Sequence, residues 1–219
     1  MDIPAHLLPT SWLWAAWLAY AALLLAALWR APWYKLDSEA LHVFLGAVVC
    51  LMVLWSLRAG ILPGLSFHLI GATAACLLFD WAFAVLAMSL VVAGVTVSGQ
   101  GDWPSFALNL LLMAGLPIAI TRFLLAFAWR RLPDNFFIYV FVNAYLAAAL
   151  SNVAVGLLAT GLHSAAGSYS PDRLLEGFLP FFLLTALPEA VFNGVVMTGV
   201  VAYRPRWVAT FDDSRYLRR

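Results

Sequence analysis

Seven long apolar runs decide what this chain can fold into. They cover residues 11–29, 41–58, 65–79, 81–98, 105–128, 136–160 and 174–203. The chain of 219 residues is 64% hydrophobic and 11% charged, whereas soluble domains are about 45–50% apolar and about 25% charged. Because no water-soluble core could absorb this excess, we predict an integral membrane protein.

The runs are continuous rather than alternating, which indicates membrane helices and not the strands of a barrel. A helical span needs about 20 apolar residues. The third and fourth runs meet at Phe79-Asp80-Trp81 with almost no loop between them. They form either two short spans or one re-entrant hairpin. The sequence therefore predicts an all-α bundle of about seven transmembrane helices.

The basic residues are distributed unequally over the loops, which predicts the orientation of the bundle. With seven spans, the loops on one side hold Arg30, Lys35, Arg130, Arg131, Arg204, Arg206, Arg215, Arg218 and Arg219. The loops on the other side hold Arg58 and Arg173, and a hairpin at residues 65–98 leaves this division unchanged. We therefore expect a multi-pass protein of the bacterial inner membrane, with the amino terminus outside and the carboxyl terminus in the cytoplasm.

No linker, repeat or low-complexity segment interrupts the chain, so residues 1–219 are predicted to form a single transmembrane domain with a cytoplasmic tail at 204–219. Residues 1–10 contain no Lys or Arg, unlike the basic start of a signal peptide. We therefore expect an uncleaved amino terminus. Asp2 is unfavourable for removal of the initiator methionine, so that Met1 is expected to keep its free amine.

Four alanines of the first run, Ala15, Ala19, Ala22 and Ala26, share one helical stripe. Stripes of small residues let helix backbones approach closely. The stripe serves either packing inside the bundle or docking of another membrane subunit.

His68 is a candidate metal ligand at the outer start of the third run. Neutral imidazole is a ligand for Zn, Cu, Ni and Co. If the amino-terminal segment folds inward, the Met1 amine, Asp2 and His6 converge with His68 on one divalent transition-metal ion. Alternatively, His68 bonds a nearby carbonyl group. We expect His42 and His163 to be solvated.

Other polar residues fall within the spans, where an ionisable group at the helix centre costs about 2.5–3.5 kcal/mol on insertion scales. Glu189 and Asn193 are four residues apart and share one helix face. Glu189 either stabilises the bundle, as a protonated group or paired with Arg122, or has a functional role. In the functional role it lines the substrate path or receives a proton. Arg122 and Asp80 are a further possible pair. Asn109 is a candidate interhelical hydrogen-bonding residue.

Several functions are excluded by missing motifs. The chain has no phosphate-binding G-x-x-x-x-G-K-[ST] loop and therefore cannot hydrolyse ATP alone. It has no H-E-x-x-H or G-x-S-x-G motif, and we expect no enzymatic activity. No basic face is available for nucleic acid. No organic cofactor is inferred.

Four segments together resemble a known family. They are the opening M-x-I-P, PGLSFHLIGATAACLL, LNLLLMAGLP and the closing PEAVFNGVVMTGVVAYRP. Over roughly the whole chain, this order resembles the substrate-binding membrane subunit of cobalt/nickel energy-coupling-factor (ECF) ABC transporters, the CbiM-type permeases. The similarity is greatest to a divergent bacterial branch.

The resemblance implies a seven-helix membrane protein whose outer amino terminus folds back into the bundle, so that residues 1–10 form a plug segment. It implies an ion held by the terminal amine, by the backbone and side-chain nitrogens of a histidine at position 2, and by a further histidine. Met1 matches the amine and His68 the further histidine. Position 2 differs, because Asp2 offers a harder carboxylate ligand. The resemblance also implies ATPase and membrane scaffold subunits as partners.

Two functions follow as hypotheses. In the first, the chain captures a divalent ion such as Co, Ni, Zn or Cu for uptake, using Met1, Asp2, His68 and His6. In the second, it is an accessory or structural subunit of another complex that kept the fold and lost the metal site. Asp2, at the position of the family histidine, supports the second hypothesis.

Overall fold

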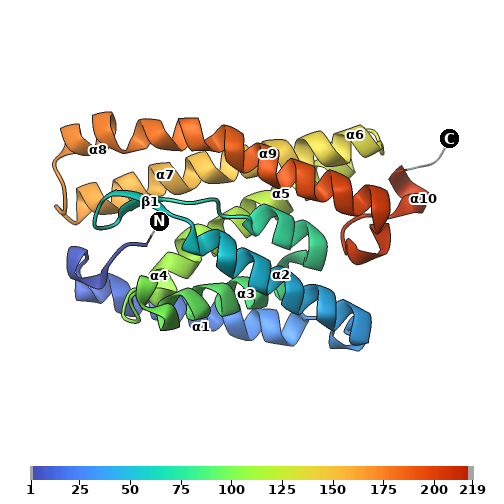
Figure 1. Cartoon of the computed structure of the whole chain (residues 1–219), viewed down its shortest axis with the longest axis horizontal. Helices are drawn as coiled ribbons and strands as arrows, with labels where there is room; N and C mark the ends of the chain where they lie inside the picture. The colour runs from blue at the N-terminus through green and yellow to red at the C-terminus, as the bar shows by residue number, and fades with distance from the viewer. Residues whose placement is uncertain (1, 217–219) are drawn as a thin grey trace.

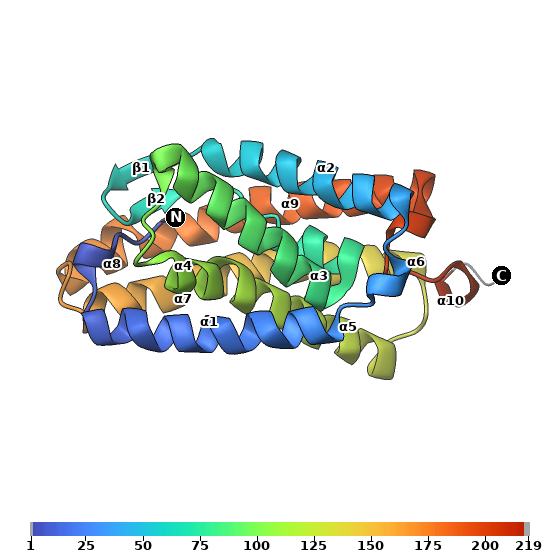
Figure 2. The ribbon, with the colours of Figure 1, turned by 90° about the horizontal axis from the view of Figure 1, so that it is seen from below.

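The computed structural model describes the backbone of residues 2–216, and every side chain among them except those of Ile61 and Asp213. Within these residues, six helical stretches are long and apolar enough to cross a membrane. They run Thr10–Arg30, Ser38–Ser56, Ala72–Gln100, Phe106–Arg131, Phe136–Ala165 and Pro171–Tyr203. The stretches form an elongated bundle (Figure 1 and Figure 2). The prediction of an all-α membrane protein is confirmed.

The elements are named as in Figure 1. The α-helices are α1 (Thr10–Arg30), α2 (Ser38–Ser56), α3 (Ala72–Val95), α4 (Phe106–Leu110), α5 (Leu116–Arg131), α6 (Phe136–Ile138), α7 (Ala147–Ala165), α8 (Pro171–Gly177), α9 (Leu179–Tyr203) and α10 (Asp213–Tyr216). The 3-10 turns are η1 (Ala5–Leu7), η2 (Trp33–Lys35) and η6 (Pro205–Trp207). Wider π-helical turns form η3 (Thr96–Gln100), η4 (Leu111–Gly115) and η5 (Tyr139–Leu146). β1 (Ala59–Leu62) and β2 (Leu65–Phe67) pair antiparallel.

α3 consists of two helices that meet at Asp80, where the chain reverses. Asp80 has φ 61° and ψ 168°, a backbone conformation that L-residues rarely adopt. Its carboxylate accepts a hydrogen bond from the Trp81 amide and pairs with Arg122 at 2.8 Å. The second arm then returns beside the first toward the β-hairpin (Figure 2). The two apolar runs that meet at Asp80 thus form a helical hairpin.

The predicted helix over 65–79 is wrong in its first half. Residues 65–67 form β2, and helix begins at Ala72. Between them the chain is not helical, and Gly71 has φ 69°, a left-handed conformation that favours glycine. The backbone N–H groups of Ile70 and Gly71 are therefore not paired within a helix. They donate instead to the side chain of Glu189 in another helix.

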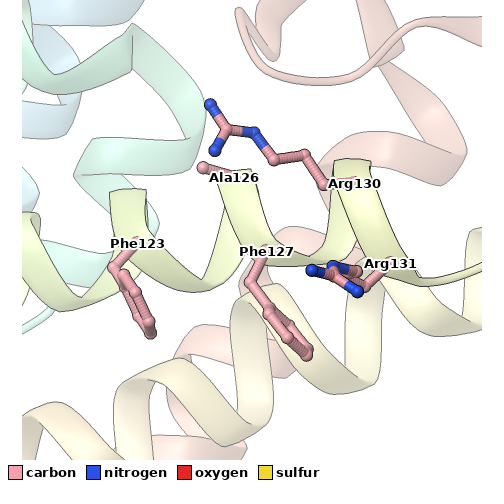
Figure 3. A pocket seen from close by; sticks show the side chains of 5 residues that line it. All are labelled: Phe123, Ala126, Phe127, Arg130 and Arg131. Atoms are coloured by element: carbon pink, nitrogen blue, oxygen red, sulfur yellow. The ribbon is translucent and has the colours of Figure 1, made fainter.

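The two ends of the bundle differ in charge. α1 ends at Arg30 and α5 at Arg131, and these ends lie near α6 and α10 (Figure 2). Phe123, Ala126, Phe127, Arg130 and Arg131 line a hollow on the last turns of α5, and Figure 3 shows Arg131 next to Phe127. The β-hairpin and α8 lie at the opposite end (Figure 1). The two ends of the bundle thus correspond to the two sets of loops that the distribution of basic residues predicts. The orientation of these ends in the membrane stays a prediction.

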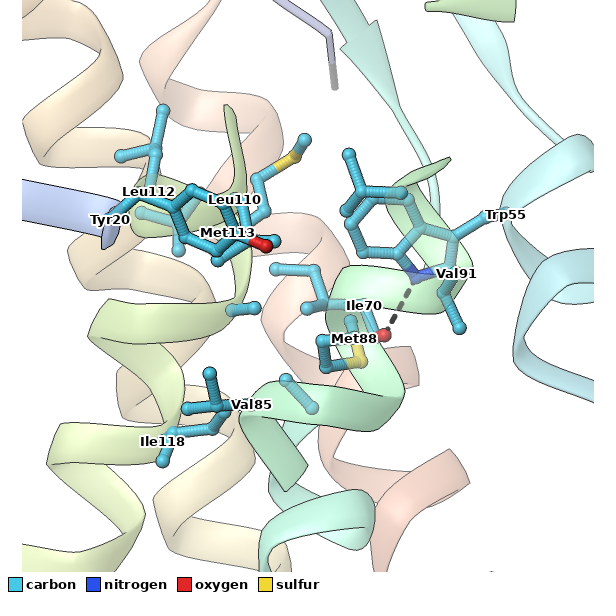
Figure 4. Close-up of a cluster of buried hydrophobic side chains, with 14 of the residues drawn as sticks. Tyr20, Trp55, Ile70, Val85, Met88, Val91, Leu110, Leu112, Met113 and Ile118 are labelled. Atoms are coloured by element: carbon cyan, nitrogen blue, oxygen red, sulfur yellow. Dashed lines mark hydrogen bonds between the residues drawn. The ribbon is translucent and has the colours of Figure 1, made fainter. Parts of the chain in front are cut away.

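The core is packed in two clusters along the bundle. The larger one joins α1, α2, α3, α4 and α7 and includes Trp55, Ile70, Met88 and Leu110 (Figure 4). It also includes Ile3, which is 0% exposed. The second cluster lies where α9 meets η5 and the carboxyl-terminal segment, and includes Tyr139. The larger cluster thus connects the amino-terminal segment with the middle of the bundle.

The carboxyl-terminal segment is packed against the bundle, rather than extending as a solvated tail. The Thr210 hydroxyl donates to the Leu77 carbonyl at 2.7 Å and lies 2.7 Å from the Tyr139 hydroxyl. Arg215 forms an ion pair with Asp134 at 2.6 Å. Residues up to 216 are therefore part of the folded domain, and residues 217–219 are outside the described part of the chain.

The alanine stripe of α1 is not used for packing inside this chain. All four of its alanines, Ala15, Ala19, Ala22 and Ala26, are exposed. α1 instead turns Ala16, Tyr20 and Ala27 toward the bundle. A close-packing face is thus available to another membrane-embedded element.

Candidate metal site

The amino-terminal segment enters the bundle and is held there by Asn109 of α4. The Ile3 amide donates to Oδ1 of Asn109 at 2.9 Å, and Nδ2 of Asn109 lies 3.1 Å from the Ile3 carbonyl oxygen. Nδ2 also donates to Oδ1 of Asp2 at 2.6 Å. Asn109 is 1% exposed. Its carboxamide thus satisfies both backbone groups of Ile3, as a neighbouring strand would. The sequence had suggested a bond between helices instead.

Two loops provide further bonds to this segment. The Ala5 amide donates to Oδ2 of Asp102 at 2.8 Å. The Ser168 hydroxyl donates to the Leu7 carbonyl oxygen. Gly64, in the turn of the β-hairpin, lies close enough that an added Cβ would be 3.3 Å from Cδ of Pro4. Residues 2–8 are therefore held by α4, the loop before it and the loop before α8, and lie beside the β-hairpin.

The carboxyl group of Asp2 is partly buried and lies among other charges. Burial raises the pKa of Asp2, and Asp102 raises it further, whereas Arg58 and the Asn109 hydrogen bond lower it. Burial lowers the pKa of Arg58, which Asp2 in turn raises. Arg58 is fixed by donating to the Gln100 carbonyl at 2.6 Å and to the Trp55 carbonyl at 3.3 Å. The side chain at position 2 is thus already engaged with protein groups.

We expect Asp2→Asn to be more stable than the wild-type chain at neutral pH. Because the pKa is raised by folding, the ionised carboxylate is less favourable in the folded than in the unfolded chain. The penalty is absent below the ordinary pKa of aspartate, where both states are protonated, and it develops as the pH rises through the raised pKa. Thermal unfolding in detergent, followed by tryptophan fluorescence between acid and neutral pH, measures this. A variant that becomes relatively less stable as the pH rises contradicts the expectation.

His68 follows β2 and lies against Trp55 of α2. The ring centroids of His68 and Trp55 are 4.5 Å apart. Nδ1 of His68 is 3.0 Å from the Leu69 carbonyl oxygen. A proton on Nδ1 that bonds this carbonyl gives the tautomer in which Nε2 carries the lone pair needed to bind a metal. Both alternatives for His68, a carbonyl bond and a ligand role, are compatible with this geometry.

A small cavity lies beside His68 on the interior side of the bundle. Its volume is about 10 Å³, room for about one water molecule. It is lined by Ser66, Phe67, His68, Ile70, Met113, Asn152, Val155, Phe182 and Thr185. Asn152 donates to the Phe182 carbonyl at 2.9 Å and to the Thr185 hydroxyl at 3.0 Å. The interior side of His68 therefore combines polar groups with little free space.

Glu189 and Asn193 of α9 cap the start of α3. The Ile70 amide donates to Oε2 of Glu189 at 2.7 Å, and the Gly71 amide donates to Oε1 at 2.8 Å. The Ala74 amide donates to Oδ1 of Asn193 at 2.8 Å. The first N–H groups of a helix lack partners within the helix, and in a membrane they must be satisfied by the protein.

The predicted alternative in which Glu189 pairs with Arg122 is wrong. Arg122 pairs with Asp80, the other partner that the sequence suggested. Glu189 is 2% exposed, and its carboxylate instead accepts backbone N–H groups. This contact is not predictable from the sequence, because residues 70 and 189 are far apart in the chain and backbone groups have no sequence signature.

The candidate ligands are only partly brought together. Among residues 2–216, no group of three or more His, Cys, Asp and Glu side chains is arranged to hold a metal. His6 lies in η1 and is exposed. Met1 lies outside the described residues. The convergence of Asp2, His6 and His68 on one ion through their side chains is therefore not observed.

His163 differs from the sequence-based expectation of a solvated residue. It lies in the last turn of α7 and is 0% exposed. Its ring contacts those of Tyr169 and Phe178, with centroids 5.4 and 6.2 Å apart. α7 continues beyond the predicted end of the run at 160, so that the following loop covers this residue.

Trp55, Asp102 and Arg58 were also missed as neighbours of the site, because each is an ordinary residue of a span border or loop in the sequence.

Comparisons with known proteins give a family and a fold. The family model described as CbiM, cobalt uptake substrate-specific transmembrane region, matches residues 2–207. No curated protein matches the chain. A crystal structure of a truncated transition metal transporter has a TM-score of 0.79 at 16% identity, covering 93% of this chain and 99% of that chain. A second crystal structure of a transition metal transporter has the same TM-score and identity, covering 92% and 93%. At this identity the two structures show a common fold.

Proposed function

We propose that this chain, which belongs to the CbiM family of cobalt uptake substrate-specific transmembrane regions, binds a divalent transition-metal ion between its amino terminus and His68 and delivers it for uptake. The observation that carries the proposal is the fixation of the amino-terminal segment inside the bundle by Asn109. The β-hairpin that leads to His68 lies beside the same segment, since a Cβ added at Gly64 would be 3.3 Å from Cδ of Pro4. These contacts support the proposal that the segment and the histidine belong to one site region.

The donor set that we propose consists mainly of nitrogen atoms. The Met1 amine and the backbone nitrogen of Asp2 supply two donors, and His68 supplies the third through its ring. Nitrogen donors suit Co, Ni, Cu and Zn. The Asp2 carboxylate contributes less, because it is bonded to Asn109. His6 is omitted from this set, since its side chain is exposed.

The energy for uptake comes, in this proposal, from partner ATPase and membrane scaffold subunits. The chain has no phosphate-binding loop of its own. The exposed alanine stripe of α1 offers a surface for close packing of a scaffold helix. With the amino terminus outside, the site region faces the source of the ion in a bacterial inner membrane. The ion is the transported substrate.

The proposal is tested by equilibrium dialysis of the detergent-purified chain, with a native amino terminus, against Co(II), Ni(II), Zn(II) and Cu(II). We expect one ion per chain. The matched control carries a short peptide before Met1, which moves the terminal amine away from His68 and is expected to remove high-affinity binding. Absence of binding to the native chain, or equal binding to the extended chain, contradicts the proposal.

An accessory or structural subunit without a metal site is the second candidate. The engagement of Asp2 with Asn109 favours it, since the position of the family histidine is then occupied by a group that already has a partner. The same dialysis separates the two, because an accessory subunit binds no ion while its fold is intact.

A further inference from the structure

The first arm of α3 begins in the interior of the bundle, which leaves its amide groups dependent on α9. Glu189 accepts from Ile70 and Gly71, and Asn193 accepts from Ala74. Asn193 also donates from Nδ2 to Oε1 of Glu189 at 2.8 Å, which fixes the carboxylate. These partners of the Glu189 side chain are all donors, so the arrangement suits an ionised carboxylate. The two residues are 2% and 0% exposed.

Ile70 is held on both sides of its backbone. Its N–H is bonded to Glu189 of α9, and its carbonyl oxygen accepts from Nε1 of Trp55 at 2.8 Å (Figure 4). Trp55 is 2% exposed, and its ring also lies against the ring of His68. His68 is two residues before Ile70, in a segment that is neither helix nor strand. A fixed Ile70 therefore limits where His68 can lie.

We propose that Glu189, supported by Asn193, is a positioning residue that sets the place of His68 in the metal site. The inference rests on the proposed function, in which His68 binds the ion. Glu189 does not touch the ion in this account. It fixes the backbone of the segment that carries the ligand, as groups behind metal ligands generally do when they orient them. α9 thereby determines the geometry of a ligand that lies on a different part of the chain.

Glu189→Gln tests the positioning role, because glutamine has nearly the same side-chain shape as glutamate. The amide group has a single acceptor oxygen, and its NH₂ group faces an N–H donor, so that one of the two backbone bonds is lost. We expect Co(II) to bind about tenfold or more weakly, in the range typical of groups behind metal ligands. We also expect a changed visible absorption spectrum of bound Co(II), because displacement of His68 alters the ligand field. Co(II) titration of the purified chain measures both.

Tyr139→Phe is the matched control. It removes a buried hydroxyl that lies 2.7 Å from the Thr210 hydroxyl, at the opposite end of the bundle from the site. We expect lower thermal stability with the Co(II) affinity and spectrum of the wild-type chain. A purely structural role of Glu189 predicts that Glu189→Gln behaves like this control.

Each outcome decides one question. Equal affinity and spectrum for Glu189→Gln and wild type overturn the positioning role while leaving the proposed function intact. Absence of Co(II) binding by the wild-type chain contradicts the proposed function itself. If Glu189→Gln does not fold, Asn193→Ala replaces it, since this variant removes the Asn193 amide that fixes the Glu189 carboxylate. A weaker, spectrally altered Co(II) complex of Asn193→Ala supports the positioning role, and an unchanged complex overturns it.

Discussion

His68→Ala is expected to weaken binding of the transition-metal ion by at least about 100-fold. Loss of a group that only orients a metal ligand already costs about 10–100-fold, and His68 is proposed to be a ligand itself. The bundle should remain folded, because His68 is half-buried and Trp55 keeps its bond to Ile70. Competition dialysis with Co(II) or Ni(II) measures the loss.

Two other histidines serve as controls for this variant. His42 is exposed in the first turns of α2, and His6 is exposed in η1. His42→Ala and His6→Ala are expected to bind the ion as the wild-type chain does. If His6→Ala loses binding, the exposed position of His6 does not persist in the ion-bound protein, and the donor set must include it. Retained affinity in His68→Ala contradicts the account of the site.

Asn109→Leu is expected to release the amino-terminal segment and to reduce metal affinity to a similar extent. Leucine has a similar size but can bond neither backbone group of Ile3. Each buried polar group left without a partner costs about 1–3 kcal/mol, which favours conformations in which the segment leaves the bundle and its backbone groups bond water. Hydrogen exchange of the Ile3 and Ala5 amides, together with metal dialysis, measures both effects.

Asn143→Leu is the matched control for this change. Asn143 is also a fully buried asparagine, but within the described residues its side chain has no hydrogen-bond partner. It lies in η5, away from the amino-terminal segment. We expect its replacement to leave amide protection of Ile3 and metal affinity unchanged. Equal protection of Ile3 in Asn109→Leu and wild type contradicts the role of Asn109.

The membrane helices were predictable, because their signal is local. The run over 11–29 became α1, and the run over 105–128 became the stretch Phe106–Arg131. The polar break at Asp80 marks the reversal inside α3, but the sequence has no pattern that predicts the positive φ of Asp80 or distinguishes a turn from a kink there. Hydropathy locates apolar segments and does not report backbone conformation within them.

The site was less predictable, because it depends on bonds between side chains and distant backbone groups. Asn109 was expected between helices and instead binds Ile3, 106 positions away. An ionisable group such as Glu189 is energetically unfavourable inside a membrane, and the sequence shows this. Its partners Ile70 and Gly71 could not be predicted, because they lie in an apolar run that predicts a continuous helix. An unpaired backbone donor leaves no trace in the sequence, so the capping of α3 required the structure.

Similarly, the family resemblance supplied Met1 and His68 but not the surroundings of position 2. Asp2 was expected to offer a carboxylate to the ion. Its bond to Asn109 and the nearby Arg58 change that expectation. The family is shown by the match over residues 2–207, whereas the ion and its ligands are proposals.

One transition-metal ion is proposed to lie between the amino terminus and His68. An anomalous-difference map of the Co(II)-bound protein, recorded at the cobalt edge, tests it most directly. We expect one peak about 2.0–2.2 Å from both the Met1 amine and a ring nitrogen of His68. A peak at another place, or a site region without a peak at saturating Co(II), contradicts it.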